Sequence, residues 1–134
     1  GFGALLLHMK NPGQYVSVSA FAPINNTLES HWGKKMVANY FNTAEEGKDW
    51  DPSQLVHSFQ GERLPILIDQ GSADKYLSEH LMTWVFVDEC KKANYPVIYN
   101  VRDHYDHSFH FVETFLESHF EFHARFLNAG KAKI

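Results

Sequence analysis

Residues 64–69, Leu-Pro-Ile-Leu-Ile-Asp, give the clearest indication of a strand in this sequence. A short, largely aliphatic run that ends in a carboxylate is typical of a strand covered on both faces, as in parallel sheets. Residues 15–21 and 97–101 are rich in β-branched and aromatic side chains and predict two further strands. Because helical stretches separate these strands, the sequence predicts parallel pairing with right-handed crossovers and an α/β fold.

Helices are expected on either side of each strand. Residues 1–10 are helix formers with apolar side chains nearly all round, and Asn11-Pro12-Gly13 ends them. Asp51-Pro52 begins another helix, which is expected to run to about residue 59, with aspartate as the N-cap. Two more helices are expected over 34–41 and 78–93, and a long amphipathic one after the loop 102–107, with a frayed tail at 130–134; the polar stretch 44–50 is expected to be a loop.

The composition excludes several classes of protein. The chain has 134 residues, 44% of them hydrophobic and 21% charged, which suits one globular domain. A formal net charge of −4 argues against nucleic acid or an anionic membrane as the main partner. No apolar run approaches the roughly 18 residues of a membrane-spanning helix, and no basic segment precedes the apolar start, so we expect neither a transmembrane helix nor a signal peptide. The single cysteine, Cys90, excludes an internal disulfide and suits the reducing cytoplasm.

Titratable side chains gather where two of the predicted strands end. Asp69 and Asp74 follow the second strand, and a histidine-rich loop with His104, His107 and His110 follows the third. In parallel sheets the loops at the carboxyl ends of the strands carry the site. An aspartate after one strand and a histidine after the next is the order in which α/β-hydrolases supply the later members of a Ser–Asp–His triad. On spacing alone, this reading and an ordinary pair of solvated loops are about equally supported.

The nucleophile of such a triad is not evident within residues 1–134. None of the serines stands in the G-x-S-x-G pattern of a nucleophile elbow, which lies on a sharp turn between a strand and a helix. The chain opens on a glycine-rich helix start, Gly1-Phe2-Gly3. We therefore expect the elbow to lie just upstream of Gly1.

Several short segments in collinear order resemble the S-formylglutathione hydrolase (esterase D) family. These segments are Gly1-Phe2-Gly3-Ala4-Leu5, Lys10-Asn11-Pro12-Gly13, Ser17-Val18-Ser19-Ala20-Phe21-Ala22-Pro23, Trp32-Gly33-Lys34-Lys35, Ile66-Leu67-Ile68-Asp69-Gln70-Gly71 and Tyr105-Asp106-His107-Ser108. The resemblance spans essentially the whole chain. It implies the C-terminal half of a single α/β-hydrolase domain, that is, the C-terminal portion of a mostly parallel sheet flanked by helices.

The resemblance also implies an activity and a set of site residues. The family's triad aspartate falls on Asp74 and its triad histidine on His107, while Trp32 matches a tryptophan of the substrate pocket. The nucleophilic serine would lie three residues before Gly1, so residues 1–134 alone are expected to be inactive. The implied reaction converts S-formylglutathione to glutathione and formate, as in formaldehyde detoxification, with no metal or organic cofactor, in a cytoplasmic homodimer.

Other readings of the chain remain open. The same scaffold could serve a carboxylesterase of broad specificity, or the chain could be a non-catalytic fragment with a binding or structural role. His104 stands where the family usually has glycine, and a positive φ there would strain the backbone by roughly 1–2 kcal/mol. For Asp69 we favour a structural role at the turn.

The remaining candidates for chemistry are weaker. For Asp106 we also favour a structural role, because a neighbour in sequence usually points away from the histidine it flanks. His119 and His123 lie one helical turn apart, as zinc ligands can, but helix-surface histidines are about five times better supported. Cys90 is expected to be a half-buried structural residue.

Overall fold

Three parallel strands form the centre of the molecule. The computed structural model describes residues 1–131, with the strands β1 (Val18–Phe21), β2 (Ile66–Gly71) and β3 (Val97–Arg102) in the order β1-β2-β3. Ile66 of β2 lies opposite Val18 on one side and Val97 on the other. Every residue of β2 is buried, so the prediction of a strand covered on both faces is confirmed.

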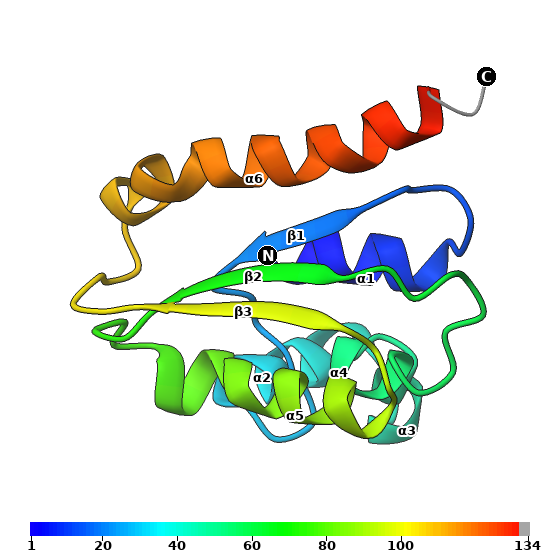
Figure 1. The fold of residues 1–134 in the computed structure, drawn as a ribbon. Helices are drawn as coiled ribbons and strands as arrows, with labels where there is room; N and C mark the ends of the chain where they lie inside the picture. The colour runs from blue at the N-terminus through cyan, green and yellow to red at the C-terminus, as the bar shows by residue number, and fades with distance from the viewer. Residues whose placement is uncertain (132–134) are drawn as a thin grey trace.

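Helices cover both faces of this sheet. Figure 1 shows the long helix α6 alone above the sheet and the helices α2 to α5 below it. The bounds are α1 (Phe2–Lys10), α2 (His31–Tyr40), α3 (Ala44–Lys48), α4 (Pro52–Leu55), a π-helical turn η1 (Leu77–Leu81), α5 (Thr83–Lys92) and α6 (Phe109–Lys131). None of these helices, within residues 1–131, has both the length and the apolar character that a membrane crossing requires.

The main core lies between the sheet and the helices α1, α4 and α5. Leu5, Ile66, Ile68 and Phe86 are fully buried in it. A second apolar cluster lies at the carboxyl ends of the strands, around Phe111. Together the two clusters fix the loops at that end, where the candidate site lies.

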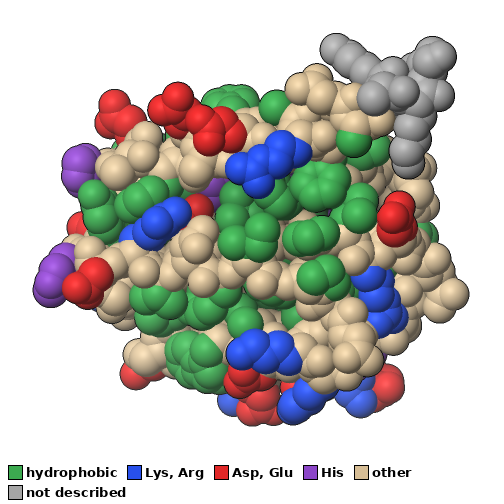
Figure 2. All heavy atoms as spheres, viewed as in Figure 1, with side chains coloured by type: hydrophobic (Ala, Val, Ile, Leu, Met, Phe, Trp, Pro, Cys, Tyr) green, Lys and Arg blue, Asp and Glu red, His purple; other side chains and the backbone are tan. Residues whose placement is uncertain are grey.

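The edge strand β3 is the least covered part of the sheet. Its side chains Ile98 and Val101 are 41% and 53% exposed. Figures 1 and 2 show the molecule in the same view. Apolar side chains gather in Figure 2 on the part of the surface where Figure 1 shows β3. This edge is therefore both unpaired and apolar among the described residues.

The structure corrects four of the predicted elements. The stretch expected to be a loop contains helix α3, because the Thr43 side chain accepts the backbone N–H of Glu46 and caps it. The Asp51 cap is confirmed, but its helix α4 ends at Leu55. The strand expected from residue 15 begins at Val18.

The helix expected over 78–93 is interrupted. Met82 adopts a left-handed conformation with φ of 49°, which separates η1 from α5. Such a conformation in a residue other than glycine is imposed by the surrounding fold and gives no local sequence signal. At the other end of the chain, α6 extends through Lys131, and the rest of the tail expected to fray, residues 132–134, lies outside the described residues.

Candidate active site

The loops after β2 and β3 lie in direct backbone contact. A Cβ added at Gly71 would collide with the carbonyl oxygen of Tyr105, so only glycine permits this approach. The backbone N–H of Ala73 donates to the same Tyr105 carbonyl at 3.0 Å. Glycine at the end of β2 therefore brings the Asp74 loop against the His107 loop.

His104 adds another contact between these two loops, and its backbone is in a left-handed conformation. Its φ is 66°, and its backbone N–H donates to the Ser72 hydroxyl at 2.9 Å. The condition that the sequence analysis left open at this position is therefore met: the backbone has a positive φ, and histidine bears the strain. The hydrogen bond to Ser72 compensates part of the conformational cost, which is about 1–2 kcal/mol for a residue with a Cβ.

Asp74 and His107 form a hydrogen-bonded carboxylate–imidazole pair. Nδ1 of His107 lies 2.7 Å from Oδ2 of Asp74. The Asp74 side chain is fully buried, whereas that of His107 is 39% exposed. A buried carboxylate that accepts from Nδ1 leaves the lone pair on Nε2 at the accessible side of the ring, as a general base requires.

Further donors hold the Asp74 carboxylate. The backbone N–H of Tyr76 donates to Oδ1 at 2.9 Å, and the side-chain amide of Gln70 donates to Oδ2 at 3.1 Å. The Tyr76 ring also meets the His107 ring edge-on, with a centroid separation of 5.4 Å. Both members of the pair are thus oriented by contacts beyond their own hydrogen bond.

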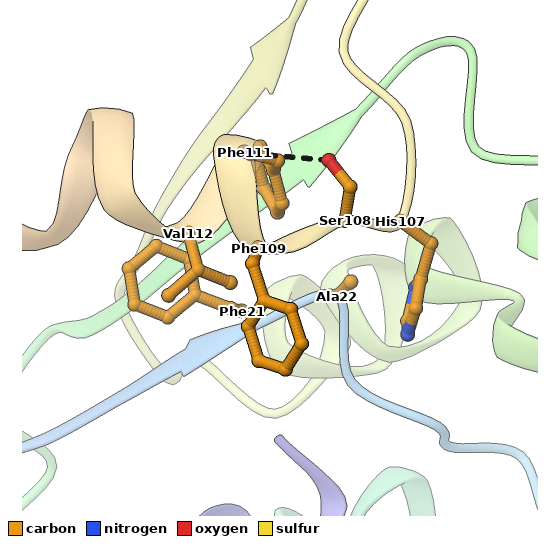
Figure 3. A pocket seen from close by; sticks show the side chains of 7 residues that line it. All are labelled: Phe21, Ala22, His107, Ser108, Phe109, Phe111 and Val112. Atoms are coloured by element: carbon orange, nitrogen blue, oxygen red, sulfur yellow. Dashed lines mark hydrogen bonds between the residues drawn. The ribbon is translucent and has the colours of Figure 1, made fainter.

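Among the described residues His107 lines three pockets, and two of them also contain Phe21 and Ala22 from the end of β1. The first encloses about 290 Å³ and is lined by Phe21, Ala22, His107, Ser108, Phe109, Phe111 and Val112. In Figure 3 the side chains of His107 and Phe109 extend to the same side of the segment that joins them, and the Ser108 hydroxyl accepts the backbone N–H of Phe111 at the start of α6. Apart from His107 and Ser108, the lining is apolar.

The second pocket joins the amino-terminal residues to the same histidine. It encloses about 240 Å³ and is lined by Gly1, Phe2, Gly3, Phe21, Ala22, Ile24, Trp32, Leu81 and His107. Trp32 stacks on His80 with a centroid separation of 4.1 Å and packs on Tyr76 at 4.7 Å. The structure therefore brings Asp74, His107 and Trp32 together, and it adds Gln70 and Tyr76, which the sequence reasoning missed.

Asp69 belongs to a second, buried constellation under α6. Its carboxylate accepts from Nε of Arg102 at 2.6 Å and contacts Nε2 of His119 at 2.6 Å. Burial alone would raise the pKa of Asp69, but the bonds to His119 and Arg102 outweigh burial and hold that pKa below its ordinary value. Asp69 is thus structural, although as an ion-pair partner between strand and helix and not as the expected cap of a turn.

The other histidines of α6 continue this constellation. The Ser19 hydroxyl contacts Nδ1 of His119 and Nε2 of His123, both at 2.8 Å, and the Ser17 hydroxyl contacts Nδ1 of His123 at 2.7 Å. Burial, followed by the nearby charge of His119, lowers the pKa of His123. His119 is buried, so the expectation of two helix-surface histidines is wrong for it. Within residues 1–131 no group of three or more His, Cys, Asp or Glu is placed to hold a metal ion.

Two other candidates from the sequence lie apart from the imidazole of His107. Asp106 is exposed, and in the described part of the chain the side-chain partner of the His107 ring is Asp74. Cys90 is fully buried, not half-buried, in the core between α5 and the sheet. Burial, followed by the neighbouring Glu89 carboxylate, raises the pKa of its thiol to about 12, which excludes a thiolate at neutral pH.

Comparisons with known proteins agree with this geometry. The family described as "Putative esterase" matches residues 1–122. S-formylglutathione hydrolases from Bos taurus and Mus musculus are each 43% identical over 131 residues, which is 96% of this chain and 46% of theirs. The solved structure of an S-formylglutathione hydrolase from Agrobacterium tumefaciens superposes with a TM-score of 0.87 at 33% identity, over 95% of this chain and 46% of that one.

These matches confirm the resemblance and the fold class read from the sequence. The chain spans about half the length of the relatives it matches. With its parallel sheet, its flanking helices and a match over most of its length, the chain belongs to this esterase family of α/β-hydrolases and is similar to S-formylglutathione hydrolases.

Proposed function

We propose that this chain supplies the acid–base part of a serine hydrolase that cleaves S-formylglutathione. Asp74 and His107 act as the triad carboxylate and imidazole, and the nucleophilic serine lies three residues before Gly1, in the other half of the same domain. The observation that carries the proposal is the 2.7 Å contact between a fully buried carboxylate and Nδ1 of a half-exposed imidazole. The similarity to S-formylglutathione hydrolases supports the choice of substrate.

The reaction proceeds through an acyl-enzyme. Nε2 of His107 takes the proton of the serine hydroxyl as its oxygen attacks the thioester carbonyl, and Asp74 stabilises the imidazolium that forms. The tetrahedral intermediate collapses, the C–S bond breaks, and His107 returns the proton to the departing glutathione sulfur. Water then attacks the formyl-serine ester while His107 takes its proton; the ester C–O bond breaks, His107 returns the proton to the serine oxygen, and formate leaves.

The environment of Gly1 supports the placement of the serine. Gly1 to Gly3 share a pocket with His107 and Trp32. A Cβ at Gly1 would lie 2.7 Å from the carbonyl oxygen of Phe21, so glycine is needed where the chain passes the end of β1. This shared pocket supports a serine shortly before Gly1 as the partner of His107.

Kinetics of the full-length protein test this proposal. We expect turnover of S-formylglutathione with kcat/KM well above that for simple acyl esters. His107→Ala should abolish most of it, and Trp32→Ala should raise KM, while Trp50→Ala, which removes a tryptophan on another surface, leaves both constants unchanged. No turnover by the wild-type protein, or full activity of His107→Ala, would refute the proposal.

A second candidate is a carboxylesterase of broad specificity. The apolar lining of the 290 Å³ pocket, from Phe21, Phe109, Phe111 and Val112, favours it, because such a surface suits an acyl group larger than formyl. A higher kcat/KM for butyl or hexyl esters than for S-formylglutathione would decide for this alternative.

We also propose a cytoplasmic homodimer. The unpaired edge of β3, with the exposed side chains Ile98 and Val101, supports association, because natural proteins seldom leave such an edge uncovered. Light scattering coupled to gel filtration of the full-length protein should give twice the monomer mass, and a monomer at micromolar concentration would contradict the proposal. Microscopy of a fluorescent fusion in its own cells tests the location, for which a diffuse cytoplasmic signal is expected and an organellar or surface signal would be contradictory.

A further inference from the structure

We infer that Gln70 is a positioning residue for the candidate triad, and that Thr83 holds the Gln70 amide in the orientation that lets it donate to Asp74. The inference rests on the proposed function, in which Asp74 orients His107. It assigns a task to a buried polar pair that the reaction itself does not use.

The Gln70 amide is fully committed to hydrogen bonds. Its Nε2 donates to Oδ2 of Asp74 and to the carbonyl oxygen of Gly71, both at 3.1 Å. Its Oε1 accepts the hydroxyl of Thr83 at 2.7 Å. Gln70 and Thr83 are both fully buried, so no solvent can replace these partners.

This pattern permits only one orientation of the amide. A flip would place Oε1 against the Asp74 carboxylate and the Gly71 carbonyl, which are both acceptors. It would also bring the NH₂ group to the Thr83 hydroxyl. The orientation is therefore set by three contacts, with Gly71 in β2, with Asp74 in the loop after β2 and with Thr83 at the start of α5.

Thr83 lies directly after the break between η1 and α5. Thr83 is the first residue of α5 and follows Met82, whose left-handed conformation ends η1. Backbone strain of this kind persists where the surrounding structure over-determines it. Here the left-handed Met82 directly precedes Thr83, whose hydroxyl donates from the start of α5 to Gln70 in the buried strand β2.

Gln70 and His107 meet the same oxygen of Asp74. Oδ2 accepts from the Gln70 amide at 3.1 Å and from Nδ1 of His107 at 2.7 Å. A donor from the strand side occupies a second lone pair of this oxygen and so fixes the orientation of the carboxylate toward His107. Without the Gln70 amide, Oδ2 of Asp74 would have His107 as its one described partner. The Asp74 carboxylate could then turn while keeping its hydrogen bond from the Tyr76 N–H to Oδ1.

Substitutions at Gln70 and Thr83 in the full-length protein test the inference. Gln70→Met keeps the size of the side chain and removes the amide; we expect kcat to fall about tenfold with KM nearly unchanged, since substrate binding is not involved. Thr83→Val should lower kcat about threefold, because Gly71 still favours the native amide orientation, and Thr83→Ser should restore the wild-type value. Thr27→Val is the matched control, because Thr27 is equally buried and its hydroxyl has no described partner.

Nitrogen-15 NMR of the His107 ring gives a readout that a merely structural role would not move. We expect one tautomer, protonated at Nδ1, in the wild-type and Thr27→Val proteins at high pH, and a tautomer mixture in Gln70→Met and Thr83→Val. The inference is overturned if Gln70→Met folds and keeps both the wild-type kcat and the single tautomer. If Gln70→Met does not fold, the same result for folded Thr83→Val overturns it. Because the NMR signal needs no turnover, a wild-type protein that lacks hydrolase activity would refute the proposed function and still leave this inference testable.

Discussion

Asp69→Asn is the substitution that best tests how α6, the helix that follows His107, is held to the sheet. The Asp69 carboxylate is fully buried and contacts Nε of Arg102 and Nε2 of His119, both at 2.6 Å. Asparagine keeps the shape but offers one acceptor and one donor. One of the two partners therefore loses its acceptor, and the negative charge between them disappears.

The expected cost follows from the burial of the groups. Breaking a buried ion pair by changing one partner costs about 3–5 kcal/mol. Arg102 is 30% exposed and can be rehydrated, and asparagine retains one acceptor, so we expect about 2–3 kcal/mol. For a protein of this size, that loss lowers Tm by roughly 5–10 °C.

The pH dependence of this effect has a defined sign. The pKa of Asp69 is lowered in the folded state, so its contribution to stability is fully present above the ordinary aspartate pKa, near 4. The contribution is lost as the pH falls through the lowered folded value. The stability difference between the wild type and Asp69→Asn should therefore be largest above about pH 4 and shrink below it.

Urea unfolding at pH 7 and at pH 3.5 measures both effects. Asp88→Asn is the control, because Asp88 lies exposed on α5. The free energy of unfolding of this variant should match that of the wild type. A free energy of unfolding of Asp69→Asn within about 0.5 kcal/mol of the wild-type value at pH 7 would refute this role of Asp69. A stability difference that grows toward low pH would refute it as well.

Three further predictions follow from single residues. Asp74→Asn should lower kcat about 10⁴-fold in the full-length protein with the fold intact, since it leaves the wrong tautomer of His107; retention of a tenth of the activity would contradict this. Gly71→Ala should lower Tm by several degrees because its Cβ meets the Tyr105 carbonyl, whereas Gly3→Ala, in a helix with open space around it, should raise Tm slightly; equal Tm values for the two variants would be contradictory. Cys90, buried and with its pKa raised to about 12, should react with iodoacetamide in urea but not in the native protein, as mass spectrometry would show; alkylation of the native protein would count against its burial.

Patterns with a local cause could be predicted from the sequence. The apolar run 64–69 predicts a buried parallel strand, and the Asp51-Pro52 pair predicts the start of a helix, because each depends on neighbouring residues alone. The left-handed conformation of Met82 and the helix after Thr43 were not predicted. Met82 adopts its conformation within a tertiary arrangement, and α3 is too short to show a helical period.

In the candidate site, too, some contacts could be predicted from the sequence and others could not. Asp74 and His107 follow successive strands, and parallel strands bring such loops together, so their proximity could be expected. The contacts Gln70–Thr83 and Asp69–His119 join residues 13 and 50 positions apart, and only the folded chain pairs them. The sequence did contain one indication of the Asp69–His119 contact, because a carboxylate at the end of a fully buried strand needs a cationic or hydrogen-bonded partner.

Labelling of the full-length protein with a fluorophosphonate, followed by peptide mass spectrometry, tests whether His107 serves a serine nucleophile upstream of Gly1. We expect a single labelled serine, three residues before Gly1, with protection by S-formylglutathione and loss of labelling in His107→Ala. Labelling of a serine within residues 1–134, or labelling that is independent of His107, would contradict it.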